Sequence, residues 1–364
     1  MRKKRDVSRT KTESNDSSNG AHRGRGGLLL LVILLGGVVV FGIVLTRTKN
    51  ENPTGAGSAQ PMPSPVYAAN KPAQEYVYAG GKLVAVTRPA SSSMDLAVWR
   101  PSTGVWWVID MASNVTAETF GQSGDIPAPA DFDGDDKTDF CVYRPSEGKW
   151  YMLFTGSGNT LGVFSFGLSG DKPVPADYKG DRKAEIAVFR PSTNTWYLQD
   201  TTQGYLGAWA WGSSGDVTVP ADYDGDGKTD IAIWRSGNPA TFYVLQSSDG
   251  GWGVQDWGVT GDKPVPGDFD GDQKTDFAVW KSDNSWYIRK SSTGTAISPS
   301  TTYGIQASDN PVQADFDSDG KTDIAVWRSS NGTWYWIPSA TGSSVQSTWG
   351  QSGDIPVAAP YRRY

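Results

Sequence analysis

The sequence predicts an all-β fold, a six-bladed β-propeller, and three observations support this prediction. A short acidic loop recurs every 45 to 47 residues, beginning at Asp131, Asp177, Asp222, Asp268 and Asp315. Each repeat contains four short segments of strand character, separated by Gly, Pro, Ser and Asn. The C-terminal segment resembles the first segment of a repeat. Four strands per unit at this period are typical of propeller blades.

The second segment of each repeat is apolar on both faces. Successive residues of a strand point to opposite faces. In DIAVWR (residues 323–328), Ile and Val fall on one face while Ala and Trp fall on the other. A strand that is covered on both sides fits blades that stack face to face around an axis. Cys141 occupies the position that Ala fills in the other repeats, so we interpret it as a buried space-filling residue and not as a reactive thiol.

Aromatic residues recur at two further positions of the repeat. A pair such as Trp334 and Tyr335 lies in the third segment of all six repeats, and an aromatic residue followed by Gly, such as Trp349, closes the fourth. Because they recur in every repeat, we interpret them as packing residues. A sugar-stacking site would be a departure from this pattern.

The two ends of the repeat region predict how the ring closes. The first repeat has no first segment of its own, and residues 355–361 match that segment, with Pro360 in place of the first Asp of the loop. We expect this C-terminal strand to pair with the first repeat and leave no free edge at the seam. A seven-bladed ring is the alternative, and it would need residues 76–86, a predicted hairpin around Gly80 and Gly81. We expect that hairpin to cap the ring or to extend the first blade.

The N-terminal region predicts a membrane anchor. Residues 28–45 are 18 consecutive uncharged residues, a length that just spans a hydrocarbon core. The basic cluster before them keeps the N-terminus in the cytoplasm by the positive-inside rule. A cleaved signal peptide is the alternative, but no small-x-small cleavage site closely follows Leu45. We therefore predict a single-pass protein with its propeller at the cell surface or in the periplasm.

The predicted organisation has four parts. They are a basic cytoplasmic tail (1–27), a transmembrane signal anchor (28–46), a Pro/Gly/Ser/Ala-rich linker (47–75) and the propeller (76–364), whose repeats start at about residue 94.

Composition excludes several classes of function. With one cysteine, Cys141, and one histidine, His22, the chain has no disulfide scaffold, no His/Cys zinc site and almost no histidine-based catalysis. The net charge is −6; residues 1–27 carry eight Lys/Arg and three Asp/Glu, a net of +5, which leaves −11 for the rest. We expect no nucleic-acid partner for so acidic a body.

The acidic loops predict metal binding. In a loop such as DYDGDGKTD (residues 222–230), carboxylates at positions 1, 3, 5 and 9 repel one another, by about 1 kcal/mol for each close pair in water. Oxygen ligands in a flexible loop, without nitrogen or sulfur, favour Ca²⁺ over Zn²⁺ or Mg²⁺. The predicted ligands are the Asp side chains at these positions and the backbone carbonyl of Lys at position 7: Asp131, Asp133, Asp135, Lys137 and Asp139; Asp222, Asp224, Asp226, Lys228 and Asp230; Asp268, Asp270, Asp272, Lys274 and Asp276; Asp315, Asp317, Asp319, Lys321 and Asp323.

The remaining loop departs from this pattern. It reads DYKGDRKAE from Asp177, with Lys179 at position 3 and Glu185 at position 9. We interpret the lysine ammonium as an internal substitute for the ion, so we predict about four calcium sites and expect this fifth loop to be empty. None of the four intact loops is an EF-hand, because position 12 holds Val or Ile instead of Glu and the flanking segments are strands.

Residues from about 94 to 364 resemble FG-GAP or VCBS-type repeats of integrin-α-like propellers, in which a D-x-D-G-D-x-x-x-D calcium loop joins the first two strands of a blade. The four intact loops are the most specific part of this resemblance. It implies a propeller, calcium that makes the blade rims rigid, and an extracellular role in adhesion or ligand capture. The chain departs from it in the first repeat, which has no acidic loop, in the loop at Asp177, and in having six repeats instead of seven.

These observations favour a binding or adhesion module for a cell-surface or extracellular protein or glycan. A lectin is the alternative, and it would need exposed aromatic residues beside polar side chains between blades. We predict that the protein is not an enzyme, because the sequence has no usable histidine, no nucleophile elbow and no paired carboxylates outside the calcium pattern.

Overall fold

The computed structural model describes residues 31–35, 38–42, 75–79, 82–87, 94–110, 112–297 and 300–359. The chain divides into two units, Met1–Val66 and Tyr67–Tyr364. In the first unit, β1 (Leu31–Leu35) and β2 (Val38–Gly42) pair as an antiparallel hairpin. The rest of the predicted tail, anchor and most of the linker lies outside the described residues, so the anchor stays a prediction. Within the described part of the chain, no helix has the length and apolar character needed to cross a membrane.

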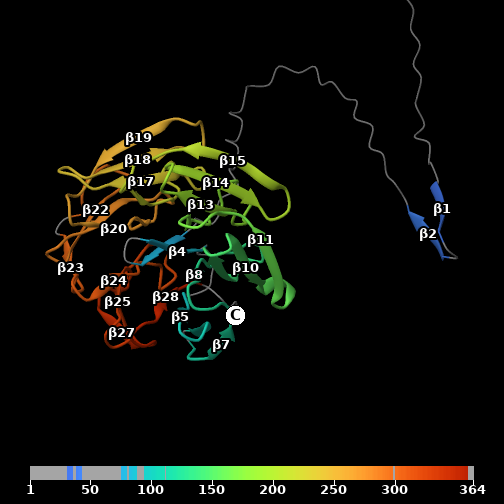
Figure 1. The fold of residues 1–364 in the computed structure, drawn as a ribbon, viewed down its shortest axis with the longest axis horizontal. Helices are drawn as coiled ribbons and strands as arrows, with labels where there is room; N and C mark the ends of the chain where they lie inside the picture. The colour runs from blue at the N-terminus through green and yellow to red at the C-terminus, as the bar shows by residue number, and fades with distance from the viewer. Residues whose placement is uncertain are drawn as a thin grey trace, which may run out of the picture. The chain divides into compact units, whose positions relative to one another are not determined.

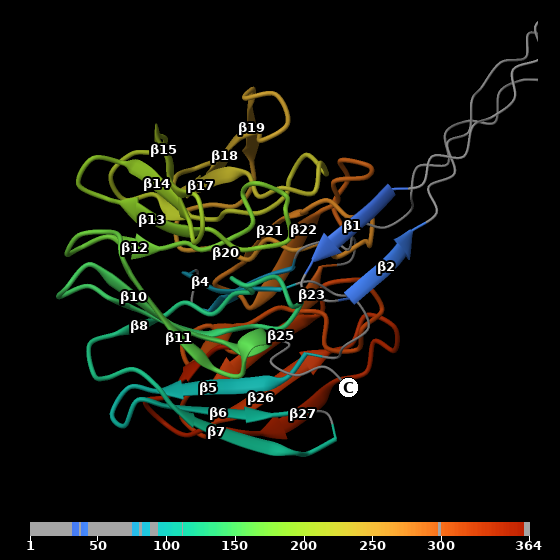
Figure 2. The same cartoon turned by 90° about the vertical axis from the view of Figure 1, so that its right-hand side faces the viewer.

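The second unit contains six four-stranded antiparallel sheets arranged as the blades of a ring (Figures 1 and 2), which confirms the predicted six-bladed propeller. The strands of each blade are given from the inner one outward. Blade 1 contains β28 (Ile355–Pro356), β5 (Leu96–Arg100), β6 (Val105–Ile109) and β7 (Val115–Thr119), and blade 2 contains β8 (Ile126–Pro127), β9 (Phe140–Arg144), β10 (Lys149–Phe154) and β11 (Thr160–Ser165). Blade 3 contains β12 (Lys172–Pro173), β13 (Ile186–Arg190), β14 (Thr195–Asp200) and β15 (Gly204–Ala210).

Blades 4 to 6 repeat the same order. They are β16 (Val217–Thr218), β17 (Ile231–Arg235), β18 (Thr241–Leu245) and β19 (Trp252–Asp256); β20 (Lys263–Pro264), β21 (Phe277–Trp280), β22 (Ser285–Arg289) and β23 (Thr301–Thr302); β24 (Asp309–Pro311), β25 (Ile324–Arg328), β26 (Thr333–Ile337) and β27 (Val345–Thr348). A single 3₁₀ turn, η1 (Thr155–Ser157), follows β10 among the described residues.

The C-terminal strand closes the ring as predicted. In β28, Ile355 pairs with Trp99 of β5, so the end of the chain completes blade 1. The Arg100 guanidinium donates two hydrogen bonds to the Asp354 carboxylate, with nitrogen–oxygen distances of 2.8 and 2.9 Å. The equivalent Arg–Asp pair recurs in blades 2, 3, 4 and 6, so the seam uses the same ion pair as the interior of the repeat.

The predicted hairpin before the repeats does not form a seventh blade, and the expectation that it could extend blade 1 was wrong. Strands β3 (Glu75–Ala79) and β4 (Lys82–Thr87) form a separate two-stranded sheet. Strand β4 contacts β16 and β3 contacts β24, the inner strands of blades 4 and 6. The hairpin therefore contacts the inner strands of two blades that are not neighbours, because blade 5 stands between them. This places it inside the ring, where Figure 1 shows β4.

The recurring aromatic residues are packing residues, as predicted. The first aromatic residue of each third strand is buried, and the Trp150 indole donates a hydrogen bond of 2.8 Å to the carbonyl of Phe166. The second one packs under the Arg of the ion pair, as Tyr151 does under Arg144 at 4.2 Å from ring centre to guanidinium. Cys141 is fully buried, and burial raises the pKa of its thiol well above the ordinary value, as expected for a space-filling residue.

Candidate metal sites in the acidic loops

Each acidic loop joins the first strand of a blade to the second, and its backbone folds around its own carboxylates. In the loop between β16 and β17, the Asp222 carboxylate accepts hydrogen bonds from the N–H groups of Gly225 at 2.6 Å and Gly227 at 2.9 Å. Asp230, at position 9, is fully buried and accepts one from the N–H of Tyr223 at 2.8 Å. These bonds hold the turn closed, and they aim the carboxylates inward.

In the four intact loops, the structure brings together the carboxylates of positions 1, 3 and 9. In each set, one oxygen from every residue lies within 4.8 Å of the others, in these groups: Asp131, Asp133 and Asp139; Asp222, Asp224 and Asp230; Asp268, Asp270 and Asp276; Asp315, Asp317 and Asp323. Two ligand oxygens on one Ca²⁺, each about 2.3–2.6 Å from the ion, lie at most about 5 Å apart. The three-carboxylate sets therefore fit a calcium-sized cation.

The carboxylates predicted at position 5 lie beside these sets and accept hydrogen bonds from hydroxyl groups. The hydroxyls come from the loop that follows the third strand, a feature that the sequence reasoning missed. Ser247 donates to Asp226 at 2.9 Å through its hydroxyl and to Asp230 at 2.7 Å through its N–H. Thr155, Ser291 and Ser339 take the same place in blades 2, 5 and 6. The recurring Ser/Thr four residues after the second aromatic residue of the third strand was the available signal.

The lysines at position 7, predicted to offer a backbone carbonyl, also have a structural role. A Cβ added at Gly225, the position 4 residue of its loop, would lie 2.6 Å from the Lys274 side chain of the next blade. The same lysine-over-glycine contact joins each pair of successive loops from blade 2 to blade 6. The last loop has Ser318 at position 4 instead of glycine. The blade that follows it around the ring is blade 1, which has no acidic loop and so no position 7 lysine to pack there. Glycine at position 4 is thus matched to the neighbouring lysine.

Burial dominates the electrostatics of these loops. It raises the pKa of Asp139, Asp230, Asp276 and Asp323, all at position 9, to about 7. It also raises the pKa of Asp222, Asp268 and Asp315 to about 6. Neighbouring carboxylates add to both shifts, because each negative charge disfavours the next. A bound cation would reverse this balance by favouring the ionised forms.

The loop at Asp177 contains its own cation. The Lys179 ammonium lies 2.6 Å from a carboxylate oxygen of Asp181 and 2.5 Å from one of Asp200. Asp181 and Glu185, at positions 5 and 9, form a carboxylate cluster with Asp200 at the end of β14, a different set from positions 1, 3 and 9 of the other loops. The hydrogen bonds to Asp181 and Asp200 raise the pKa of Lys179, so the ammonium stays charged. Its geometry matches the prediction that the lysine takes the place of the ion.

Comparison with known proteins agrees with this geometry. The FG-GAP-like repeat family matches residues 177–233 and 268–326 of the chain. Each span begins at the acidic loop of one blade and ends in the second strand of the next. The chain therefore contains FG-GAP-like repeats within its six-bladed propeller. No curated protein sequence matches the chain.

Two solved structures resemble the chain at low sequence identity. A lectin from Agrocybe aegerita that recognises non-reducing terminal N-acetylglucosamine is 12% identical, with a TM-score of 0.51 over 74% of this chain and 79% of that chain. Virginiamycin B lyase from Staphylococcus aureus is 9% identical, with a TM-score of 0.45 over 79% of this chain and 87% of that chain. At such identities the likeness concerns the fold alone.

Within this propeller, the acidic loops are linked to one another around the ring. The position 8 N–H of one loop donates to the position 1 carbonyl of the preceding loop, for example Thr229 to Asp177 at 2.9 Å and Thr275 to Asp222 at 2.8 Å. The loops therefore form a hydrogen-bonded belt from blade 2 to blade 6. Ordering one loop restrains the loop beside it.

Proposed function

We propose that the protein is a membrane-anchored, extracytoplasmic, calcium-binding propeller that acts as an adhesion or ligand-binding module for a protein or a cell-surface polymer. The observation that carries the proposal is the recurrence of one carboxylate set, positions 1, 3 and 9, in four loops of the same belt. Three buried or half-buried carboxylates within one ion's reach are unfavourable without a cation. Four repetitions support a structural ion in each loop, because a catalytic ion would need only one.

Calcium is the cation that suits these loops best. The side chains that converge there all offer carboxylate oxygens as metal ligands. Backbone N–H and hydroxyl groups, such as those of Ser247, complete the surroundings. Hard oxygen ligands in a turn that is free to adjust favour Ca²⁺, whose coordination is flexible, over Mg²⁺. Bound calcium would replace electrostatic repulsion in each loop with cross-links inside the belt, and it would make that rim of the propeller rigid.

Two observations support a binding module over an enzyme. The acidic groups repeat from blade to blade, whereas an active site would differ from its equivalents in other blades. The centre of the ring, where many propellers could place a site, contains the β3–β4 hairpin between β16 and β24. The basic residues before residue 28 and the linker after residue 46 support placing the ring outside the cytoplasmic membrane, tethered by its N-terminus.

Carbohydrate binding is the second candidate function. It is favoured by Trp252, which is 68% exposed on the outer strand β19, since sugars stack on exposed aromatic rings. The fold shared with a lectin makes the same suggestion, but only at the level of the fold.

The test is binding of the full purified chain to a panel of extracellular proteins and to a glycan panel, each in calcium and in chelator. We expect saturable binding in calcium that falls at least tenfold in chelator. The Asp276→Ala variant should weaken binding, whereas Asp249→Ala, an acidic residue outside the calcium pattern, should not. Binding to glycans that Trp252→Ala abolishes would establish the lectin function. A folded, calcium-loaded chain that binds neither panel would contradict the proposal.

A further inference from the structure

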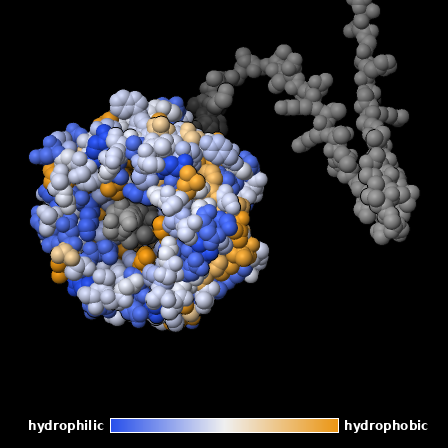
Figure 3. All heavy atoms as spheres, viewed as in Figure 1, coloured by the Kyte–Doolittle hydropathy of each residue, from blue (hydrophilic) through white to orange (hydrophobic). Residues whose placement is uncertain are grey.

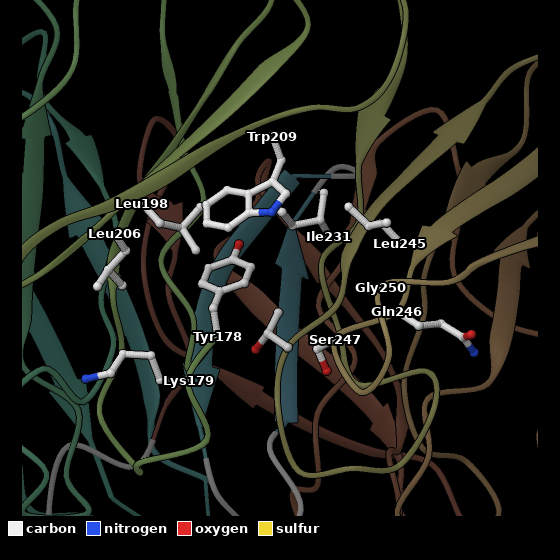
Figure 4. A pocket seen from close by; sticks show the side chains of 11 residues that line it. Tyr178, Lys179, Leu198, Leu206, Trp209, Ile231, Leu245, Gln246, Ser247 and Gly250 are labelled. Atoms are coloured by element: carbon white, nitrogen blue, oxygen red, sulfur yellow. The ribbon is translucent and has the colours of Figure 1, made fainter. Parts of the chain in front are cut away.

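A pocket of about 470 Å³ lies between blades 3 and 4, and it is lined mainly by apolar side chains. Figure 4 shows the indole of Trp209, on β15, above the ring of Tyr178. Leu198 and Leu206 of blade 3 lie on one side, and Ile231 and Leu245 of blade 4 on the other. This volume and lining are typical of sites for small ligands or for single anchoring side chains.

The pocket lies where the next blade interface has an aromatic ring on its second strand. This position holds Phe in two blades, as Phe140 and Phe277, and Leu or Ile in the other four. At the next interface, Phe277 opens the second strand, and its ring packs 5.1 Å from Tyr223 and 5.2 Å from Phe242. The equivalent residue between blades 3 and 4 is Ile231, which is smaller and has no ring. Interiors are otherwise packed to high density, so a missing ring leaves space.

The Trp209 ring is held over this space by the local backbone. A Cβ added at Gly207 would lie 2.7 Å from the ring, so only glycine leaves room for the indole to fold back along β15. The side chain of Trp209 nevertheless remains 36% exposed. Other exposed apolar side chains lie nearby on outer strands, including Tyr205 on β15 and Val254 on β19. Hydrophobic residues also gather along the outer side of the ring next to β11 (Figure 3).

Three of the polar side chains that line the pocket are engaged in other contacts. The Tyr178 hydroxyl donates to the carbonyl of Val174 at 2.8 Å, and the Ser247 hydroxyl donates to Asp226 at 2.9 Å. Lys179 is held by its two carboxylates. A sugar in this pocket would leave several hydroxyls without partners, and each would cost free energy. An uncharged ring would lose no hydrogen bond on entry.

We infer that this pocket binds an uncharged aromatic ring, stacked against Trp209 and enclosed by Leu198, Leu206, Ile231 and Leu245. The ring could belong to a free aromatic compound or to an aromatic side chain of a protein partner. The inference deepens the proposed binding function, because it gives the propeller one defined anchoring point. It places that point beside the loop that contains Lys179, at a blade interface where Ile231 stands at the position that Phe277 fills in the next blade.

The test uses photoaffinity labelling of the full chain with an uncharged aryl diazirine, in calcium, with the labelled peptides identified by mass spectrometry. We expect saturable labelling of the peptides that contain Leu206, Trp209 and Leu245. Indole and a tryptophan-containing peptide serve as competitors. The competitor that acts at the lower concentration identifies the source of the ring.

The decisive variant is Ile231→Phe, which fills the pocket with the residue that the same position has in blades 2 and 5. It should reduce labelling of these peptides at least tenfold while the chain stays folded. Trp209→Ala should reduce labelling about three- to tenfold, the range expected for one aromatic contact. The control Trp252→Ala removes an exposed indole outside the pocket, and labelling should not change.

Two results would overturn the inference. One is labelling that Ile231→Phe and Trp209→Ala both leave unchanged, and the other is displacement of the label by N-acetylglucosamine but not by indole. The labelling does not depend on a macromolecular partner. If the pocket is labelled as expected but the full chain binds neither panel, the proposed function fails and the pocket assignment stands.

Discussion

The loops that begin at Asp177 and Asp222 occupy the same place in neighbouring blades, but they differ in the charge at position 3. In the first, Lys179 places an ammonium between two carboxylates, and Glu185 stands at position 9. In the second, Asp224 occupies the place of that lysine and adds a third negative charge to the set. The comparison teaches that a lysine at position 3 brings a positive charge into the carboxylate cluster of one loop, whereas an Asp at that position adds to the negative charge of the other.

The lysine requires a change elsewhere in its blade. Asp200, which binds Lys179, lies 21 residues away at the end of β14, where blade 2 has Phe154 and blade 4 has Gln246. Burial alone would raise the pKa of Asp200, but the hydrogen bonds from Lys179 and Thr202 lower it. Lys179 and Asp200 are therefore a matched pair of substitutions that keeps the carboxylates of this loop paired with a cation.

Removing calcium should have the largest effect, because it acts on four loops and leaves the Lys179 loop intact. An ion present at 100 times its dissociation constant stabilises the fold by about 2.7 kcal/mol per site, so chelation should lower the free energy of unfolding by about 10 kcal/mol. Urea unfolding of the full chain in calcium and in chelator measures this effect. Chelation that leaves the unfolding midpoint unchanged would mean that the four loops hold no stabilising ion.

Lys179→Ala tests the other side of the comparison. It leaves Asp181 and Asp200 without their cation, which should cost about 3 kcal/mol in chelator. Calcium should restore part of the loss, since Asp181, Glu185 and Asp200 already form a cluster that fits a cation. The matched control is Lys274→Ala, a lysine at position 7 whose stem packs over Gly225; its smaller effect should not depend on calcium. Equal losses in the two variants, with no response to calcium, would refute the substitution.

The pH dependence should distinguish the two forms of the protein. In chelator, the folded chain holds protons on Asp139, Asp230, Asp276 and Asp323, whose pKa values are raised to about 7. The folded state then binds more protons than the unfolded state, so stability should fall by more than about 1 kcal/mol as pH rises from 5 to 8.

With calcium the trend should reverse. The ion binds the ionised carboxylates, and its affinity should rise through the same pH range. Unfolding midpoints at pH 5 and 8, with and without chelator, test both directions. Parallel pH profiles would indicate that these four carboxylates do not bind the ion.

The smallest effect concerns the contact between neighbouring loops. Gly225 has a φ of +79°, and a methyl group there would also meet Lys274 of the next blade. We expect Gly225→Ala to cost about 1–2 kcal/mol through the backbone and the displaced lysine. Gly320→Ala is the control, because its φ of +84° is similar and nothing lies within 4 Å of the added Cβ. Thermal unfolding should show the larger loss for Gly225→Ala.

The sequence was sufficient to predict the repeated strands, the acidic loops and the one loop in which Lys179 departs from the pattern. The period, the apolar second strand and the C-terminal match predicted the blades and their closure, because each depends on local residues in a fixed register. Lys179 was identified because it interrupts a conserved spacing within this one chain. Its partner Asp200 could not be identified, since their contact depends on how the third strand returns beside the loop.

Other features needed the structure for a similar reason. The place of the β3–β4 hairpin between β16 and β24 depends on contacts with distant blades, and no local pattern encodes them. The pocket beside Ile231 depends on how side chains of two blades meet, and its place is clear only when Phe277 is seen to pack on Tyr223 at the next interface. The lysine-over-glycine contacts likewise join residues about 50 positions apart.

The central claim is that four loops bind calcium and that Lys179 keeps the fifth from doing so. The most direct measurement is the calcium stoichiometry of the full chain by isothermal titration, beside Asp276→Ala and Lys179→Asp. The account predicts four ions per chain, three for Asp276→Ala and five for Lys179→Asp. No bound calcium, or the same number in all three proteins, would contradict it.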